Sequence, residues 1–225
     1  SPEDAWQLAY YVASLQEPAH WNLVTRATRV TGTLPMTSDD PRWVLAERTD
    51  VRLRQAVSPT GEWVHPPTVT AVTFQTLYNE EAVAFRIVWN DPTEDRGEAA
   101  DRLVLLLRPP SVQGDVVTLQ AWPYLGAPML DLCAWSAQMG QVTETLAADF
   151  EGVLQRQGTQ IPLKGAAHYA DGRWALVIQR ALQPASPAGA AVLTSDAFNA
   201  VAVTVWDGAF PDARAVSMWI DVVLP

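Results

Sequence analysis

An Asp-Gly dipeptide, Asp171-Gly172, constrains the fold more than any other feature of the sequence. It lies between Gln160–Tyr169 and Arg173–Arg180, two segments in which apolar and polar residues tend to alternate. Asp-Gly suits a two-residue turn with positive backbone φ, which joins two antiparallel strands. The sequence therefore predicts a β-hairpin in the last third of the chain.

Short strands are also predicted along most of the remaining chain. Clusters of Pro, Gly, Asn and Asp separate them, and these residues stop strands and form turns. The predicted strands are His20–Thr33, Asp50–Gln55, Val69–Phe74, Ala82–Trp89, Arg102–Arg108, Val116–Trp122, Met129–Ala137, Ala200–Trp206 and Ala215–Val223. About ten short strands with little helix predict a mainly β protein, an antiparallel β-sandwich with a few short helices.

One of these short helices is expected within Gln141–Gln157. Apolar residues from Val142 to Leu154 recur there at helical spacing. A strand that begins at Val153 is the alternative.

Composition excludes several classes of protein. The chain has 225 residues, 48% of them hydrophobic, and is long enough to form a large core without disulfides. Its formal net charge of −10 at pH 7 argues against nucleic-acid binding, which needs clustered lysine and arginine. No apolar run approaches the roughly 20 residues of a transmembrane helix. The single cysteine, Cys133, lies in an apolar run, so a buried and inert thiol is expected.

Residues 1–16 are expected to form a terminal helix, and residues 17–225 a β-sandwich domain. Ser1 is placed as an N-cap, acidic residues follow in the first turn, and apolar residues from Trp6 to Leu15 recur on one face. This segment resembles the last helix of a class I cytochrome c domain, which implies that a c-type haem domain precedes it. An ordinary N-terminal helix that packs on the sandwich is the alternative.

The sequence lacks the short motifs of several enzyme classes. It has no glycine-rich phosphate loop, no Gly-x-Ser-x-Gly and no Cys-x-x-Cys-His. His20, His65 and His168 lie far apart, without the spacing of a zinc site. Acidic pairs such as Asp39-Asp40 fall in predicted turns, where charge usually marks a solvated loop. We therefore expect no catalytic residues and no enzymatic activity.

The sequence contains ten tryptophans, and several fall in or at the ends of predicted strands. Trp122, Trp135 and Trp174 are among them. On a sandwich, such side chains either line a pocket for a flat ligand, such as a sugar or a porphyrin, or fill a large core.

Lys164 is the only lysine among fifteen basic residues. An amine that loses its proton can bind a metal, whereas a guanidinium cannot. Lys164 is therefore a candidate metal ligand, and a solvated surface lysine is the alternative.

A series of stretches, in order from Thr25 to Leu224, carries a resemblance to a known family. The stretches are GTLPMTSDDPRW, RLRQAVSP, TVTAVTFQTLYNEEAVAFRIVWNDPTED, DRLVLLL, LDLCAWSA, HYADGRWALVIQRAL and AVAVTVWDGAFPDARAVSMWIDVVL. Their order resembles the haem b-binding (gamma) subunits of ethylbenzene dehydrogenase, dimethyl sulfide dehydrogenase and the selenate, chlorate and perchlorate reductases. The Trp-x-Asp-Pro-Thr and Trp-Asp-Gly pieces are the most specific parts of the match.

The resemblance implies a sandwich that holds one non-covalent haem b, with a methionine and a lysine as axial ligands. A thioether and a neutral amine complete six-coordination of the iron, and the lysine must lose a proton against a reference pKa of about 10.4. Met129 is the implied methionine ligand, with Met139 as the next candidate. The implied metal ligands and haem-contacting residues together are Met129, Lys164, Trp122, Trp135 and Trp174.

The implied function is electron transfer in the periplasm. Such a domain would shuttle single electrons between a molybdenum/iron-sulfur oxidoreductase of the dimethyl sulfoxide reductase family and a c-type cytochrome. Two other functions stay open on the residues alone. One is a carbohydrate-binding β-sandwich that uses exposed tryptophans as stacking platforms, and the other is a structural subunit of a redox complex that has lost its haem.

Overall fold

The computed structural model describes residues 23–57, 65–112, 119–120, 122–123, 127–150, 161–185 and 188–225. These residues form β-strands and one short 3-10 helix, η1 (Pro41–Leu45). The strands are β1 (Leu23–Arg26), β2 (Thr28–Arg29), β3 (Thr49–Gln55), β4 (Ala71–Tyr78), β5 (Ala82–Asn90), β6 (Arg102–Leu107), β7 (Leu130–Ser136), β8 (Val142–Ala147), β9 (Ile161–Ala170), β10 (Arg173–Ala181), β11 (Phe198–Trp206), β12 (Arg214–Ser217) and β13 (Ile220–Val223). The prediction of a mainly β protein is confirmed.

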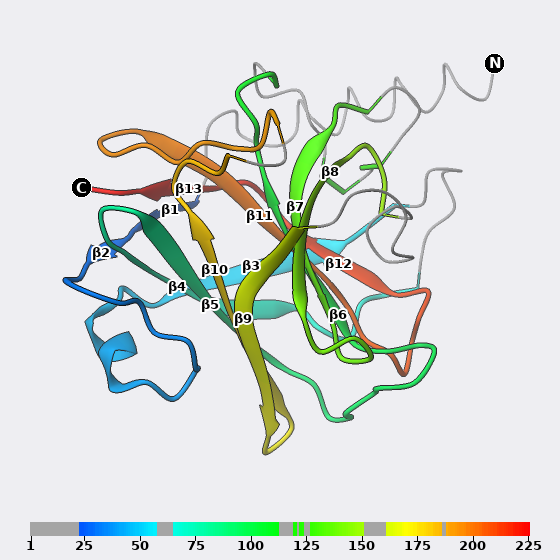
Figure 1. Ribbon diagram of the computed structural model, residues 1–225. Coiled ribbons are helices and arrows are strands. Elements are labelled where there is room, and N and C mark those ends of the chain that lie inside the picture. Colours follow the sequence, from blue (N-terminus) through cyan, green and yellow to red (C-terminus); the bar gives the residue numbers. More distant parts are fainter. Residues whose placement is uncertain are drawn as a thin grey trace.

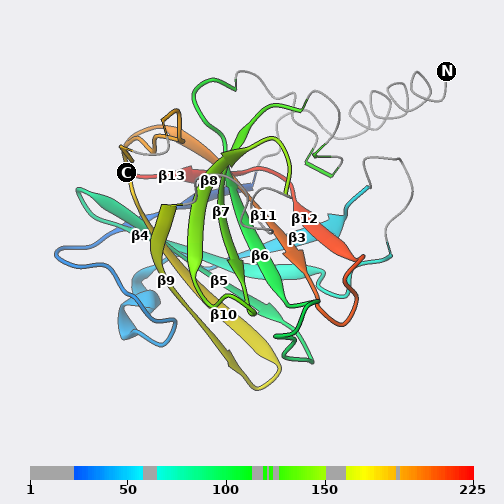
Figure 2. The same ribbon diagram turned by 45° about the vertical axis from the view of Figure 1, so that its right-hand side comes forward.

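The strands form two layers, shown in Figure 1 and, turned by 45°, in Figure 2. One layer contains β11, β6, β7 and β8, with β13 and β12 following one another along the far side of β11 and β1 beyond β13. The other layer contains β3, β4, β5, β10 and β9. Pairing of β12 with β3 and of β8 with β9 joins the layers along both sides. The predicted antiparallel sandwich is confirmed, with closed sides that give it the character of a barrel.

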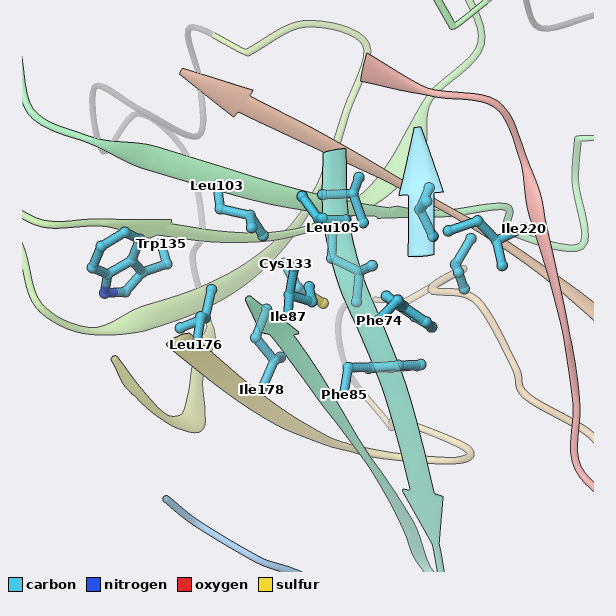
Figure 3. Packing of buried hydrophobic residues seen from close by; sticks show 14 of the residues in the cluster. Phe74, Phe85, Ile87, Leu103, Leu105, Cys133, Trp135, Leu176, Ile178 and Ile220 are labelled. Carbon is cyan, nitrogen blue, oxygen red and sulfur yellow. The ribbon is translucent and has the colours of Figure 1, made fainter. Parts of the chain in front are cut away.

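Inward-facing side chains of the two layers form one large core, part of which Figure 3 shows. Alternate residues of each strand contribute to it, since successive side chains of a strand point to opposite faces. Phe74 of β4 and Phe85 of β5 are examples, with ring centroids 5.7 Å apart. Cys133 of β7 is fully buried in this core, and burial raises the pKa of its thiol well above the usual value. The expected burial of the thiol is confirmed.

A second apolar cluster covers the outer face of β6, β7 and β11. Strand β6 contributes to both clusters: Leu103 and Leu105 belong to the inner core, whereas Val104 and Leu106 belong to the outer cluster. Burial on both faces explains why this strand is a nearly continuous apolar run in the sequence.

The predicted hairpin is formed by β9 and β10. Both turn residues have positive φ, 51° at Asp171 and 69° at Gly172. Glycine adopts this conformation without steric cost, and aspartate is one of the residues that tolerates it. In the resulting register, Arg173 pairs with Ala170 beside the turn.

The helix expected within Gln141–Gln157 is wrong for the part that the structure describes, because β8 occupies Val142–Ala147. Strand β8 pairs with β7 on one side and with β9 on the other. Its alternation places Val142 in the inner core, and Glu144 is buried beside Arg180. Pairing on two sides outweighs the helical spacing of the apolar residues.

The single strand predicted at Ala215–Val223 is two strands. Strand β12 pairs with β11 and β3, whereas β13 pairs with β11 and β1. Met218 and Trp219 separate the two strands. Both strands pair with β11, and β12 also pairs with β3 of the other layer.

Two predicted elements lie outside the described residues. They are the N-terminal helix, and with it the division between residues 1–16 and 17–225, and most of the strand at Val116–Trp122. Among the residues that are described, none belongs to a helix of the length and apolar character that a bilayer crossing demands.

Candidate functional site

Trp135 and Trp174, two of the predicted ligand-contacting residues, lie together in the inner core. Their ring centroids are 4.8 Å apart in an edge-to-face arrangement, and they are 2% and 0% exposed. Trp89 packs on both of them at 6.0 and 6.3 Å. These side chains fill the space between the two layers at one end of the sandwich.

Trp122 belongs to the outer cluster and is therefore separated from Trp135 and Trp174 by a layer of the sandwich. Its ring lies edge-on to Phe150 at 4.7 Å, and its Nε1 donates a hydrogen bond of 3.1 Å to the carbonyl of Pro128. Arg214 donates to the carbonyl of Trp122 and stacks over Phe150 at 5.1 Å. Burial lowers the pKa of Arg214 to about 10.

The two predicted metal ligands, Met129 and Lys164, both lie at the surface. Met129 precedes β7 and is 51% exposed. Lys164 is exposed on β9, and its neighbours Leu163 and Gly165 occupy the alternate positions of the strand. Because Leu163 packs against the inner core, the side chain of Lys164 faces away from the core. Met139, the second candidate methionine, is half-buried in the turn after β7.

A polar hollow of about 420 Å³ opens where the β4–β5 turn meets the C-terminal end of the chain. This volume lies within the roughly 300–1,000 Å³ typical of small-molecule sites. We refer to it as the polar hollow, and its lining residues are Arg29, Tyr78, Asn79, Glu80, Leu182, Ser195, Asp196 and Pro225.

Hydrogen bonds fix the walls of the polar hollow. Asn79 donates to the carbonyl of Gly32 at 2.8 Å and accepts from the backbone N–H groups of Glu81 and Ala82, so its amide holds the turn in place. Asp196 has a φ of 55°, and its N–H donates to the carbonyl of Leu224 at 2.8 Å.

The charged groups of the polar hollow are accessible to a ligand. Arg29 and Glu80 form an ion pair of 2.9 Å, with side chains that are 61% and 83% exposed. Tyr78 closes the hollow from the core side, and its buried hydroxyl has no hydrogen-bond partner among the described residues. Carboxylates, a guanidinium and a hydroxyl thus surround a space for a small polar molecule.

The polar hollow escapes sequence reasoning because its residues come from five separate segments. Only the turn at Asn79-Glu80-Glu81 gave a signal, and that signal is the one expected of any hairpin turn.

Three carboxylates lie close together at a second place, where they are buried, unlike the exposed charged groups of the polar hollow. We call Asp91, Asp101 and Asp207 the acidic cluster. They are 0%, 0% and 3% exposed, and a ligand atom from each lies within 4.8 Å of the others. Burial, with repulsion from Asp101 and Asp207, raises the pKa of Asp91 to about 6 against the hydrogen bonds from Thr93. Burial also raises the pKa of Asp101.

The acidic cluster accepts hydrogen bonds from neutral groups. Asp101 accepts from the Nε1 of Trp174 at 2.9 Å and from the N–H groups of Gly208 and Asp95, both at 2.8 Å. Asp207 accepts from the N–H of Ala209 and from the hydroxyl of Thr68.

A second group of buried acids, Asp131 and Glu144, has a different balance of charge. Arg180 contacts both of them, at 3.1 Å and 2.8 Å. It also donates to the carbonyl of Ala191. This group is internally paired, because a buried cation accompanies the two acids.

No protein-family model matches the sequence, and no curated protein matches it. Two solved structures of a family 9 carbohydrate-binding module from Caldicellulosiruptor kristjanssonii are similar in fold. The module in complex with glucose matches with a TM-score of 0.54 and 10% identity, over 90% of this chain and 95% of the module. The module in complex with cellotriose matches with a TM-score of 0.52 and 11% identity, over 91% of this chain and 94% of the module.

These matches contradict the expected membership of the haem b-binding subunit family. The expected haem b, the c-type haem and the electron-transfer function are wrong on this comparison, because the fold is that of modules solved with sugars. The cytochrome and oxidoreductase descriptions are corrected with them. Without a haem, no role as haem ligand or haem contact remains for Met129, Lys164, Trp122, Trp135 and Trp174.

Proposed function

We propose that this chain is a carbohydrate-binding module, a β-sandwich that binds a sugar and has no catalytic activity of its own. The observation that carries the proposal is the match of 90% of the chain to the fold of a module solved with glucose. A match of similar extent to the same module with cellotriose supports a short glucan as the first ligand to test.

The polar hollow is the site that we propose for the sugar. Sugar hydroxyls both donate and accept hydrogen bonds, and carboxylates such as those of Glu80 and Asp196 accept them strongly. The Arg29 guanidinium supplies donors beside Glu80. Hydrogen-bond partners of both kinds therefore line one hollow of suitable volume.

Exposed tryptophans are not part of the proposal. Among the described tryptophans, six are at most 9% exposed and Trp219 is half-buried; the six are Trp43, Trp89, Trp122, Trp135, Trp174 and Trp206. Phe198 of β11 is 66% exposed and follows Asp196, a lining residue of the polar hollow, by two residues in the sequence. Aromatic rings of this kind pack against flat apolar surfaces of ligands.

A module of this kind works where its polysaccharide is, so we propose an extracytoplasmic location. The molybdenum enzyme and cytochrome partners belonged to the contradicted electron-transfer function, and the proposed partner is a polysaccharide instead. The acidic net charge of −10 is compatible with a neutral glycan, which carries no charge to repel.

Isothermal titration calorimetry and affinity electrophoresis with a panel of oligosaccharides and polysaccharides test the proposal. The panel includes glucose, cellotriose and soluble β-glucans. We expect saturable binding with a Kd of roughly 10 μM to 1 mM. Absence of binding to every member of the panel would contradict the proposed function.

Asp196→Asn tests the place of binding. Asparagine tolerates the left-handed backbone that Asp196 adopts, so the substitution removes charge with little strain. We expect a loss of affinity of about tenfold or more, because a hydrogen bond to a charged acceptor contributes roughly 1.5–3 kcal/mol. Asp212→Asn, at an exposed position of the β11–β12 turn, is the matched control. Equal affinity of both variants and the wild type would place the sugar outside the polar hollow.

A further inference from the structure

The acidic cluster of Asp91, Asp101 and Asp207 has no role in the proposed sugar site. Asp91 follows β5, Asp101 precedes β6 and Asp207 follows β11. Strand β5 belongs to one layer of the sandwich, and β6 and β11 belong to the other. The cluster therefore sits where the ends of both layers meet.

The charge of the acidic cluster is not balanced by protein groups. In the described parts of the chain, its hydrogen-bond donors are backbone N–H groups, two hydroxyls and one indole, and none of its members forms an ion pair. The nearby Arg96 pairs with Glu94 at 2.6 Å and lies over the Trp174 ring. Removing a charge from water costs several kcal/mol per ion unless an opposite charge accompanies it.

One oxygen of the acidic cluster has no hydrogen-bond partner among the described residues. Oδ1 of Asp91 accepts from the N–H and hydroxyl of Thr93, but Oδ2 is buried and accepts no hydrogen bond. Buried carboxylate oxygens usually have a hydrogen-bond partner, so Oδ2 of Asp91 is free to bind an ion.

Asp131 also has one buried oxygen without a hydrogen-bond partner among the described residues, so the two acidic groups differ in their balance of charge and not in this respect. Asp131 and Glu144 have Arg180 between them, which supplies the positive charge. The acidic cluster contains one more carboxylate than that group and has no corresponding cation among the described residues.

We propose that the acidic cluster is a calcium-binding site. Oxygen ligands of one Ca²⁺ lie roughly 2.3–2.6 Å from the ion, so any two of them are separated by about 5 Å at most. The ligand atoms of Asp91, Asp101 and Asp207 meet this condition, because all lie within 4.8 Å of one another. Ca²⁺ suits the site better than Mg²⁺, which retains several waters and requires a stricter octahedral geometry.

Gly208 explains how the third carboxylate reaches the other two. A Cβ at position 208 would overlap the carbonyl oxygen of Ala99 and the Cβ of Asp95. Only glycine allows the β11–β12 turn to approach the segment before β6 so closely. The N–H of Gly208 then donates to Asp101, which sets Asp207 beside it.

A bound ion at this position ties the β5–β6 connection to the β11–β12 turn. It would act on stability, since an ion that binds only the folded state raises the free energy of unfolding. This inference does not depend on the proposed sugar binding.

Metal content, terbium luminescence and thermal unfolding test the proposal on the whole chain. Purified protein dialysed against CaCl₂ is expected to retain about one calcium per chain by elemental analysis. Tb³⁺ is expected to give luminescence on excitation of tryptophan, because the Trp174 indole bonds directly to Asp101. Ca²⁺ is expected to displace Tb³⁺ at lower concentration than Mg²⁺.

The unfolding temperature gives the clearest test. The wild type and the Asp91→Asn variant are expected to change order between EDTA and Ca²⁺. At a hundredfold excess of Ca²⁺ over its Kd, the wild type is expected to melt about 5–10 °C higher than in EDTA. Asp91→Asn removes one repelling charge and a ligand, so in EDTA it should melt above the wild type and in Ca²⁺ below it. Asp212→Asn, an exposed change in the same turn, should respond to Ca²⁺ as the wild type does.

Two results would overturn the proposal. The first is wild-type protein that retains no calcium and melts at the same temperature in Ca²⁺ and EDTA. The second is an Asp91→Asn protein that gains as much from Ca²⁺ as the wild type. Equal responses to Mg²⁺ and Ca²⁺ would overturn the assignment of calcium.

Discussion

Nη2 of Arg180 lies 3.1 Å from Oδ2 of Asp131, and both side chains are completely buried between the layers of the sandwich. Arg180 comes from β10 in one layer and Asp131 from β7 in the other. Glu144 of β8 lies on the same guanidinium at 2.8 Å. One cation thus joins three strands across the core.

Arg180→Met should strongly destabilise the fold, because it leaves two acids buried without a positive charge. Removal of one partner of a buried ion pair costs about 3–5 kcal/mol. Urea unfolding at pH 8 measures the loss. Arg173→Met, at the exposed start of the same strand, is the control and should change stability by less than about 0.5 kcal/mol. Similar unfolding midpoints for the two variants would contradict the importance of the buried pair.

The stability of the protein should fall as the pH rises from about 4 to about 7, in part because of Asp131. Burial raises the pKa of Asp131 to about 7, with repulsion from Glu144 adding to it and Arg180 opposing it. The folded state therefore binds more protons than the unfolded state in this range, and the free energy of unfolding decreases with pH. The contribution is fully present below the pKa of the unfolded chain and is lost through pH 7.

Asp131→Asn isolates this contribution. Urea unfolding from pH 4 to pH 8 should give a flatter profile for the variant than for the wild type, because the variant has no proton to lose at this position. Parallel profiles would show that Asp131 does not titrate with a raised pKa.

Gly165→Ala should destabilise the hairpin at its contact with β8. An added Cβ would lie 2.5 Å from Cγ2 of Val142 and 2.7 Å from the carbonyl oxygen of Val177. Overpacking of this kind costs roughly 1–3 kcal/mol. Gly97→Ala is the matched control, because nothing lies within 4 Å of its added Cβ. Thermal unfolding of both variants checks the difference, and equal melting temperatures would contradict it.

The local signals in the sequence predicted most of the strands. Asp171-Gly172 fixed the hairpin because its conformation depends on two residues alone, and both have the positive φ that the dipeptide favours. Strand β8 was missed because its identity depends on pairing with β7 and β9, which no local pattern records. The polar hollow was missed for the same reason, since its residues are brought together only by the fold.

The tryptophans show the limit of reasoning from residue type. Trp135 and Trp174 lie in strands as expected, whereas Trp122 belongs to no strand among the described residues. Alternation alone does not tell which face of a strand is buried by the other layer. Trp135 and Trp174 turned out to face the inner core, and Trp122 the outer cluster. Of the two readings that the sequence left open, a large aromatic core is the one that the structure shows for these three residues.

The two most specific motifs in the resemblance to haem b-binding subunits lie close together in the structure. The Trp-x-Asp-Pro-Thr piece supplies Asp91, and the Trp-Asp-Gly piece supplies Asp207 and Gly208. All three meet in the acidic cluster at the end of the sandwich. These motifs therefore mark how the two layers are connected, and they do not identify a cofactor.

The pairing of β12 with β3 and of β8 with β9 has a consequence for self-association. An open sandwich presents backbone N–H and C=O groups along its edges, and another chain can add a strand there and begin an aggregate. Here β12 pairs with β3 and β8 with β9, so among the described strands these two margins are closed, and β1 keeps an open edge beside β13. Along the closed margins, another molecule would therefore contact side chains and loops, and strand addition by a second chain would be confined to the edge at β1.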